Sequence, residues 1–101
     1  MISKHWTVYI IQAKSGKLYT GITTDLKRRF QEHKKKRKGA SFFHFSSPER
    51  IVFQESHPNR SKASIREGAI KKMTLEEKIK LIDCQHSLSN QHLLGFEKKE
   101  V

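Results

Sequence analysis

Residues 7–21 read TVYIIQAKSGKLYTG, and this stretch decides the fold of the chain. Its first half is β-branched and aromatic, which predicts a strand over residues 5–13. Residues 17–22 have the composition of a second strand. Residues 14–17, where the two strands meet, predict a tight hairpin turn, because Gly16 can take the positive φ that such turns require.

Each predicted strand carries one tyrosine, Tyr9 and Tyr19, and the hairpin would bring both into one small sheet. Tyrosine is common in strands, and a buried ring with a hydrogen-bonded hydroxyl needs no catalytic role. Packing is therefore one interpretation of this pair. A shared functional site is the other, and it gains weight from an arginine and an inward-facing carboxylate further along the chain.

The charge of this 101-residue chain is strongly positive, with a formal net charge of +11. Residues 27–38 hold eight basic residues and one glutamate, so most of that charge lies in one run. Such a run can be only a solvated face, and no apolar amphipathic face accompanies it to favour a membrane surface. Nucleic acid is the favoured partner, because clustered Lys and Arg neutralise phosphates. The predicted contacts are Lys27, Arg28, Lys34, Lys35, Lys36, Arg37 and Lys38.

The single cysteine, Cys84, cannot form an internal disulfide or a zinc site alone, which fits a reducing compartment. The apolar run from Val8 to Ile11 is too short for a signal peptide or a membrane span. We therefore expect a cytoplasmic, membrane-free protein, with a monomer favoured.

The rest of the chain predicts a helix over residues 26–36, a loop over 37–48 and a third strand over 50–56. Two helices follow. The first runs over residues 61–72 with Ser61 as N-cap, and the second over 75–83 behind a capping box at Thr74 and Glu77.

This order, ββαβαα, predicts an α/β fold: a small three-stranded, mainly antiparallel sheet flanked by helices. We expect one domain over residues 1–84 and a polar, irregular tail over 85–101 that can dock on it. A chain of 101 residues is too short to form two hydrophobic cores.

In the first helix, Leu26, Phe30 and His33 recur at i, i+4 and i+7 and form one apolar face. Arg29 flanks this face, whereas Arg28 points away from it. Arg29 can be an ordinary surface arginine or a phosphate clamp, since its planar guanidinium holds two phosphate oxygens at once. His33 can likewise be a satisfied buried residue or part of a site.

In the following helix, Glu67 falls within the stripe of small and apolar residues marked by Ala63 and Ile70. An unpaired carboxylate there would be costly, so Glu67 should meet a cation. One interpretation is a hydrated divalent metal with a single carboxylate ligand. The other is a salt bridge, with Arg66, Arg29 or Lys71 as the candidate partners.

The remaining aromatic and imidazole side chains suggest no further site. The other five histidines show no paired metal-ligand spacing, and we expect them on the surface or in loops. Phe42, Phe43 and Phe45 can stack on bases or cap the core. Residues assigned to the core are Trp6, Phe30, Phe53 and Phe96.

From Trp6 to about Ile82 the chain resembles the compact, stand-alone bacterial branch of the GIY-YIG nuclease superfamily. Thr7-Val8-Tyr9 and Tyr19-Thr20-Gly21 correspond to its two signature motifs. Arg29 follows Gly21 by eight residues, as the family's arginine follows its motif, with His33 one turn further on. The metal-binding glutamate of the family corresponds to Glu67.

This resemblance implies a metal-dependent endonuclease of low sequence specificity that hydrolyses phosphodiesters of DNA, or of RNA, with Mg²⁺ or Mn²⁺. It implies Tyr9 as general base, Arg29 as phosphate clamp and Glu67 as metal ligand. Tyr19 and His33 would orient water and phosphate. These side chains should line one cleft. The alternative is a non-catalytic, basic nucleic-acid-binding module on the same scaffold.

Overall fold

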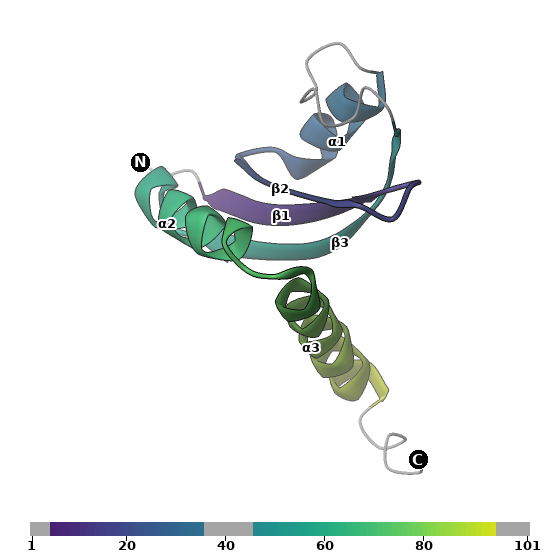
Figure 1. The fold of residues 1–101 in the computed structure, drawn as a ribbon. Coiled ribbons are helices and arrows are strands. Elements are labelled where there is room, and N and C mark those ends of the chain that lie inside the picture. Colours follow the sequence, from purple (N-terminus) through teal and green to yellow (C-terminus); the bar gives the residue numbers. More distant parts are fainter. Residues whose placement is uncertain (1–4, 36–45, 95–101) are drawn as a thin grey trace.

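The computed structural model describes residues 5–35 and 46–94, with side chains described as far as residue 86. Three strands and three helices follow one another in the order ββαβαα (Figure 1). No helix in these two ranges is both long and apolar enough to cross a lipid bilayer.

The sheet consists of β1 (Trp6–Ala13), β2 (Leu18–Thr23) and β3 (Pro48–His57). The strands are arranged β2-β1-β3, and both pairs are antiparallel. The predicted hairpin joins β1 to β2, and Gly16 has a φ of 97°, the conformation for which this glycine was expected. β1 is the central strand, so Tyr9 lies between β2 and β3.

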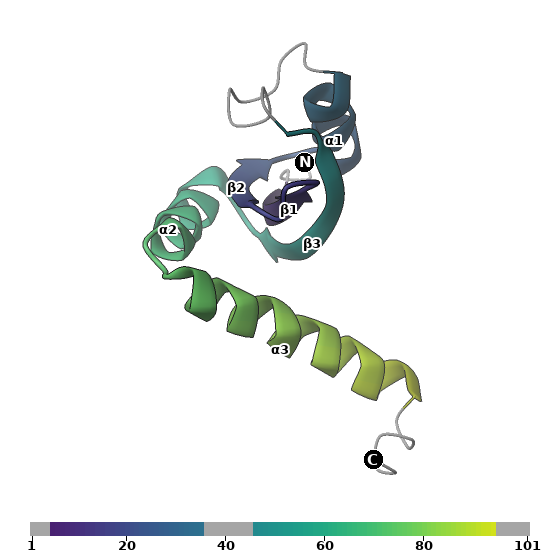
Figure 2. The ribbon, with the colours of Figure 1, turned by 45° about the vertical axis from the view of Figure 1, so that its right-hand side comes forward.

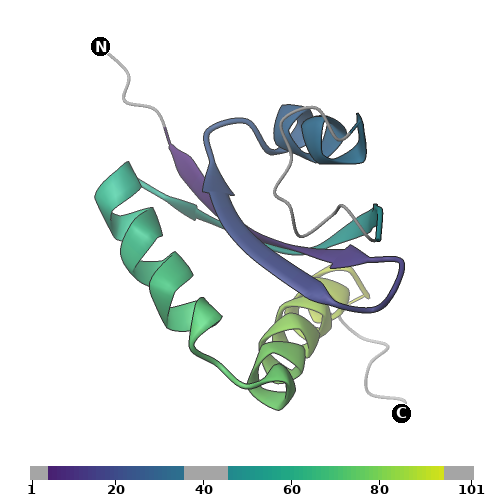
Figure 3. The same cartoon turned by 45° about the horizontal axis from the view of Figure 1, so that its top comes forward.

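The helices divide between the two faces of the sheet (Figures 1 and 3). One face carries α1 (Leu26–Lys35), and the other carries α2 (Arg60–Lys71) and α3 (Leu75–Leu94). Because strand residues alternate between faces, β1 feeds two cores. The α1 core is built around Tyr9, Ile11 and Ala13. The core beneath α2 and α3 contains Val8, Ile10, Val52, Phe53, Ala63, Ile70 and Ile82. The predicted fold class is confirmed.

The second helix begins earlier than predicted. Asn59, not Ser61, is the N-cap of α2, and its side chain accepts a hydrogen bond from the backbone N–H of Lys62 at 2.9 Å. Asparagine caps as well as serine does, so composition alone did not separate the two positions. The capping box of α3 is confirmed, because Thr74 and Glu77 bond each other's backbone N–H groups.

The third helix is longer than predicted, because α3 continues through the stretch predicted to be irregular and ends at Leu94. That stretch is polar but contains no proline or glycine before Gly95, so nothing in it stops a helix. Figure 2 shows the far end of α3 extending away from the sheet. Of the two isoleucines on this helix, Ile82 is buried, whereas Ile79 is 46% exposed.

Polar side chains attach α3 to β3. The Gln85 side chain donates to the carbonyl of Gln54 at 2.8 Å and accepts from its N–H at 3.2 Å. His86, expected in a loop or on the surface, lies on α3 and its Nε2 is 3.0 Å from the carbonyl of Val52. These contacts hold the helix against the outer strand.

Candidate active site

The Tyr9 side chain lies on the α1 face of the sheet and is 1% exposed. It crosses the neighbouring strand at Gly21, its partner in the β1–β2 register. A Cβ at position 21 would stand 2.6 Å from the Tyr9 hydroxyl oxygen and 2.8 Å from Cζ. Gly21 is therefore a glycine because the phenol occupies the space of its missing side chain.

His33, on α1, is fully buried against this phenol. Its Nε2 lies 3.3 Å from the Tyr9 hydroxyl oxygen. The Tyr19 ring meets the His33 ring edge-on, with 5.3 Å between centroids, and lies 6.3 Å from the Tyr9 ring. The apolar face predicted for α1 is thus correct in orientation, and His33 is its most buried residue.

Burial sets the protonation of this pair. The pKa of Tyr9 is raised to about 12, mainly because burial disfavours the phenolate and secondly because Tyr19 is near. Arg29 opposes the rise through a hydrogen bond and its charge. The pKa of His33 is lowered to about 4 by burial and then by Arg29. Both side chains are neutral at pH 7 in the free protein.

Arg29 lies at the border of the apolar face of α1, as predicted, with its side chain 30% exposed. It hydrogen bonds to Tyr9 and forms an ion pair with Glu32, 3.0 Å from Nη1 to Oε1. Arg28 points outward, with its side chain 70% exposed. The sequence analysis missed Glu32, although its i, i+3 spacing from Arg29 marks it as a partner that holds the guanidinium in place.

Glu67 lies on α2 with its side chain 22% exposed, and its Oε2 is 3.2 Å from Nζ of Lys71, one of the salt-bridge partners considered above. Among the effects on the pKa of Tyr9, the charge of Glu67 is the smallest, and it raises that pKa. Lys71 is more than half exposed and can swing into solvent.

The described residues contain no cluster of three or more His, Cys, Asp or Glu side chains that could enclose a metal ion. A single partly exposed carboxylate suits Mg²⁺, which keeps several waters and binds through one or two carboxylates plus substrate phosphates. The donor set of Glu67 therefore fits a sparsely ligated Mg²⁺ or Mn²⁺ and excludes a preformed zinc-type cage.

The side chains expected to line one cleft differ in exposure. Tyr19, Arg29 and Glu67 are half-buried and reach the surface, whereas Tyr9 and His33 lie beneath it. Of the basic run, the structure describes Lys27, Arg28, Lys34 and Lys35, which are exposed on α1. The remaining predictions fall outside the described side chains and concern Lys36, Arg37, Lys38, the phenylalanines at 42, 43, 45 and 96, and the polar tail.

Comparison with known proteins identifies the scaffold. Residues 5–80 match the model of the GIY-YIG catalytic domain. The chain belongs to the GIY-YIG family. The match spans the whole sheet, all of α1 and α2, and both tyrosines, so the resemblance drawn from the sequence motifs is confirmed.

The chain is also similar to bacterial UPF0213 proteins. The chain is 39% identical over 85 residues to UPF0213 protein plu4503 of Photorhabdus laumondii, covering 84% of this chain and 81% of that protein. It is 44% identical over 77 residues to UPF0213 protein DP2720 of Desulfotalea psychrophila, covering 76% and 70%. The solution structure of UPF0213 protein BH0048 from Bacillus halodurans matches with a TM-score of 0.52 and 32% identity, over 79% of this chain and 84% of that one.

Proposed function

We propose that this protein is a divalent-metal-dependent endonuclease that hydrolyses phosphodiester bonds of DNA, with RNA as the alternative substrate, and with low sequence specificity. The observation that carries the proposal is the contact between the buried Tyr9 hydroxyl and neutral His33, with Arg29 at the same hydroxyl. A tyrosine with a purely structural role requires neither an arginine at its hydroxyl nor a glycine that leaves space for its ring.

Tyr9 is the proposed general base. With the His33 proton on Nδ1, the Tyr9 hydroxyl donates to Nε2, so His33 orients the phenol, and Tyr9 as the phenolate would take a proton from the attacking water. Because His33 Nε2 lies 3.3 Å from the Tyr9 hydroxyl oxygen, we assign His33 to Tyr9. The half-buried ring of Tyr19 would position the water from the open side.

Arg29 is the proposed phosphate clamp. Glu32 fixes one edge of its guanidinium, and a phosphate would replace part of the contacts that the other donors make. Glu67 would hold Mg²⁺ or Mn²⁺, which when bound supplies positive charge to the scissile phosphate and the leaving oxygen. The same charge favours the phenolate of Tyr9.

The substrate class rests on charge. Lys27, Arg28, Lys34 and Lys35 form an exposed basic surface on α1, the helix that carries Arg29 and His33. Such side chains bind phosphates with no preference for sequence, which supports low specificity. A cytoplasmic site of action fits the single cysteine and the nucleic-acid substrate.

The test is cleavage of supercoiled plasmid, single-stranded DNA and RNA with Mg²⁺, Mn²⁺ or EDTA. Glu67→Ala should eliminate the metal-dependent cleavage while the protein stays folded and still binds nucleic acid. Glu76→Ala is the matched control, since it removes an exposed carboxylate at the start of α3. It should cut like the wild type.

If the wild-type protein binds nucleic acid but does not cut it with either metal, the non-catalytic binding module is the better account. If Glu67→Ala cuts normally and mainly lowers the melting temperature, the Lys71 bridge is the role of Glu67 and the metal assignment is wrong.

A further inference from the structure

A groove lies between the hairpin turn and α3, on the face of the sheet opposite Tyr9. One cavity of about 470 Å³ is lined by Leu18, Leu75 and the turn, and a second of about 230 Å³ continues beneath α3. Both cavities include Gly16, Leu18 and Leu75, so they form one groove. We call it the α3 groove.

The floor of the α3 groove is aliphatic. Leu75, Ile79 and Ile82 follow one another at i, i+4 and i+7 along α3 and line it together with Leu18 and Val52. Leu75 is 61% exposed and Ile79 46%, so the stripe continues from the core into an uncovered surface. Contiguous exposed apolar side chains on a small protein are typical of an interaction site.

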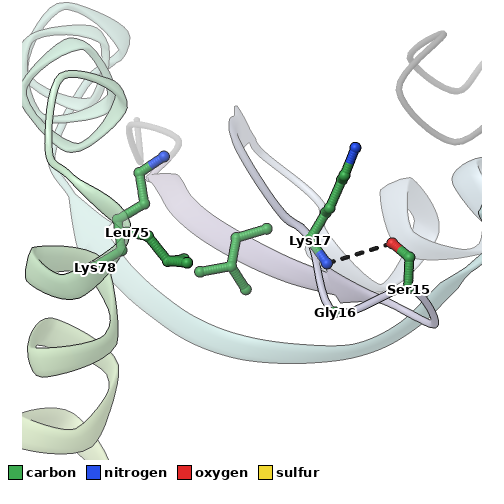
Figure 4. A pocket seen from close by; sticks show the side chains of 6 residues that line it. Ser15, Gly16, Lys17, Leu75 and Lys78 are labelled. Carbon is green, nitrogen blue, oxygen red and sulfur yellow. Dashed lines mark hydrogen bonds between the residues drawn. The ribbon is translucent and has the colours of Figure 1, made fainter.

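The rim of the groove is mainly basic. Lys17 and Lys78 flank the larger cavity from opposite sides, and Arg50 borders the smaller one, against a single acidic residue, Asp83. Figure 4 shows Leu75 of α3 pointing toward the hairpin turn, with the Lys17 and Lys78 side chains extending to the same side of the cavity. Arg50 is held by Gln12, and neither lysine has an ion-pair partner among the described residues.

Two other occupants fit less well. A second copy carries the same net charge of +11, which opposes its approach. No phenylalanine, tyrosine or tryptophan among the described residues lines the groove, although stacking of unpaired bases relies on such side chains.

We propose that the α3 groove binds an acidic, amphipathic helical segment of a partner protein. Aliphatic side chains on one face of that helix would enter between Leu18 and the α3 stripe. Its carboxylates would meet Lys17, Lys78 and Arg50 at the rim. The groove shares no lining residue with the candidate active site, so both can be filled at once.

The test is an NMR titration of the full-length ¹⁵N-labelled protein with a synthetic helical peptide that carries leucines at i, i+4 and i+7 flanked by glutamates. A peptide of identical composition with the leucine spacing scrambled controls for charge alone. We expect amide shifts at the residues lining the groove, and binding that the scrambled peptide does not reproduce.

Leu75→Glu should weaken the patterned peptide about tenfold or more, because it places a carboxylate on the exposed floor without disturbing a buried residue. Lys80→Glu is the matched control: it reverses an exposed charge on the same helix outside the groove, and should leave the affinity within about twofold.

The proposal fails if neither peptide shifts the groove amides, if the scrambled peptide binds equally well, or if Lys80→Glu weakens binding as much as Leu75→Glu. Displacement of the peptide by a single-stranded oligonucleotide that shifts the same amides would instead assign the groove to nucleic acid. None of these readouts depends on cleavage, so they are separate from the test of the proposed nuclease.

Discussion

The two faces of the sheet bury different kinds of side chain. Beneath α2 and α3, the strands bury Val8, Ile10 and Phe53 in a cluster of apolar side chains. Beneath α1, the same central strand buries a phenol against an imidazole, although both could hydrogen bond to water if exposed. Stability therefore comes mainly from the face beneath α2 and α3. The α1 face can hold buried polar groups, although burying them costs free energy.

The largest effect should follow from removing the Tyr9 hydroxyl. In Tyr9→Phe, cleavage should fall by about 10²–10⁴-fold, the range for loss of a general base. The ring remains, so the free energy of unfolding should change by no more than about 1–2 kcal/mol, the cost of leaving His33 Nε2 without its partner. Rates of plasmid cleavage and urea unfolding measure the two quantities. Cleavage at the wild-type rate would make Tyr9 a core residue only.

The opposite face should give the opposite result. Ile10→Ala removes a fully buried side chain and should cost about 2–5 kcal/mol of unfolding free energy. Cleavage per folded molecule should stay near that of the wild type, because Ile10 points away from α1. Urea unfolding and cleavage at low temperature check both. A selective loss of activity in fully folded protein would show that the two faces are coupled.

Lowering the pH should destabilise the folded protein through His33. Its pKa is about 4 in the folded protein against 6.5 for an ordinary histidine, so the unfolded chain binds the proton first as the pH falls. Stability present above pH 6.5 should therefore be lost between pH 6.5 and 4, by up to about 3 kcal/mol.

The matched variant is His33→Gln, in which the overall stability is lower but this part of the pH dependence should disappear. Urea unfolding at several pH values gives the slope for each protein. Equal slopes would show that His33 titrates normally and that the acid sensitivity comes from other groups.

The fit of Tyr9 over Gly21 should be sensitive to one methyl group. Gly21→Ala places a Cβ 2.6 Å from the Tyr9 hydroxyl oxygen, so the phenol must move and cleavage should fall about 10–100-fold. Gly68→Ala is the control, because no heavy atom outside the local helix backbone lies within 4 Å of its added Cβ. It should keep full activity and gain up to about 1 kcal/mol of stability. Equal activity of the two variants would contradict the close fit.

The smallest effect concerns an exception on the apolar face. Thr20 is 4% exposed, and its hydroxyl has no hydrogen-bond partner among the described residues. Thr20→Val keeps the shape and removes the buried hydroxyl, so it should raise the free energy of unfolding by about 0.5–1 kcal/mol. A thermal melt is sufficient to detect it. A lower melting temperature would indicate that a buried water satisfies this hydroxyl.

The features predicted correctly from the sequence are those that local patterns determine. The hairpin, the order of elements and the orientation of α1 follow from alternation, turn chemistry and helical spacing, and all agree with the structure. The end of α3 was predicted wrongly because polar residues without a breaker are compatible with both helix and loop. Its extension depends on tertiary contacts such as those of Gln85 with Gln54.

The candidate site was predicted residue by residue but not in its arrangement. Spacing and resemblance supplied Tyr9, Arg29 and Glu67. No pattern could show that His33 lies against the Tyr9 hydroxyl, since these residues are 24 positions apart and meet only when α1 packs on the sheet. The raised pKa of Tyr9 follows from that packing as well, because burial is its largest cause.

The two hydrogen bonds between the Gln85 side chain and the Gln54 backbone have a consequence for aggregation. β3 is an outer strand, and an outer strand with free N–H and C=O groups is a template on which a second chain can add. The Gln85 amide occupies both groups of one residue in the middle of that edge, as a neighbouring strand would. A side chain from a helix thereby occupies this part of the edge and opposes strand addition, where the described residues provide no further strand.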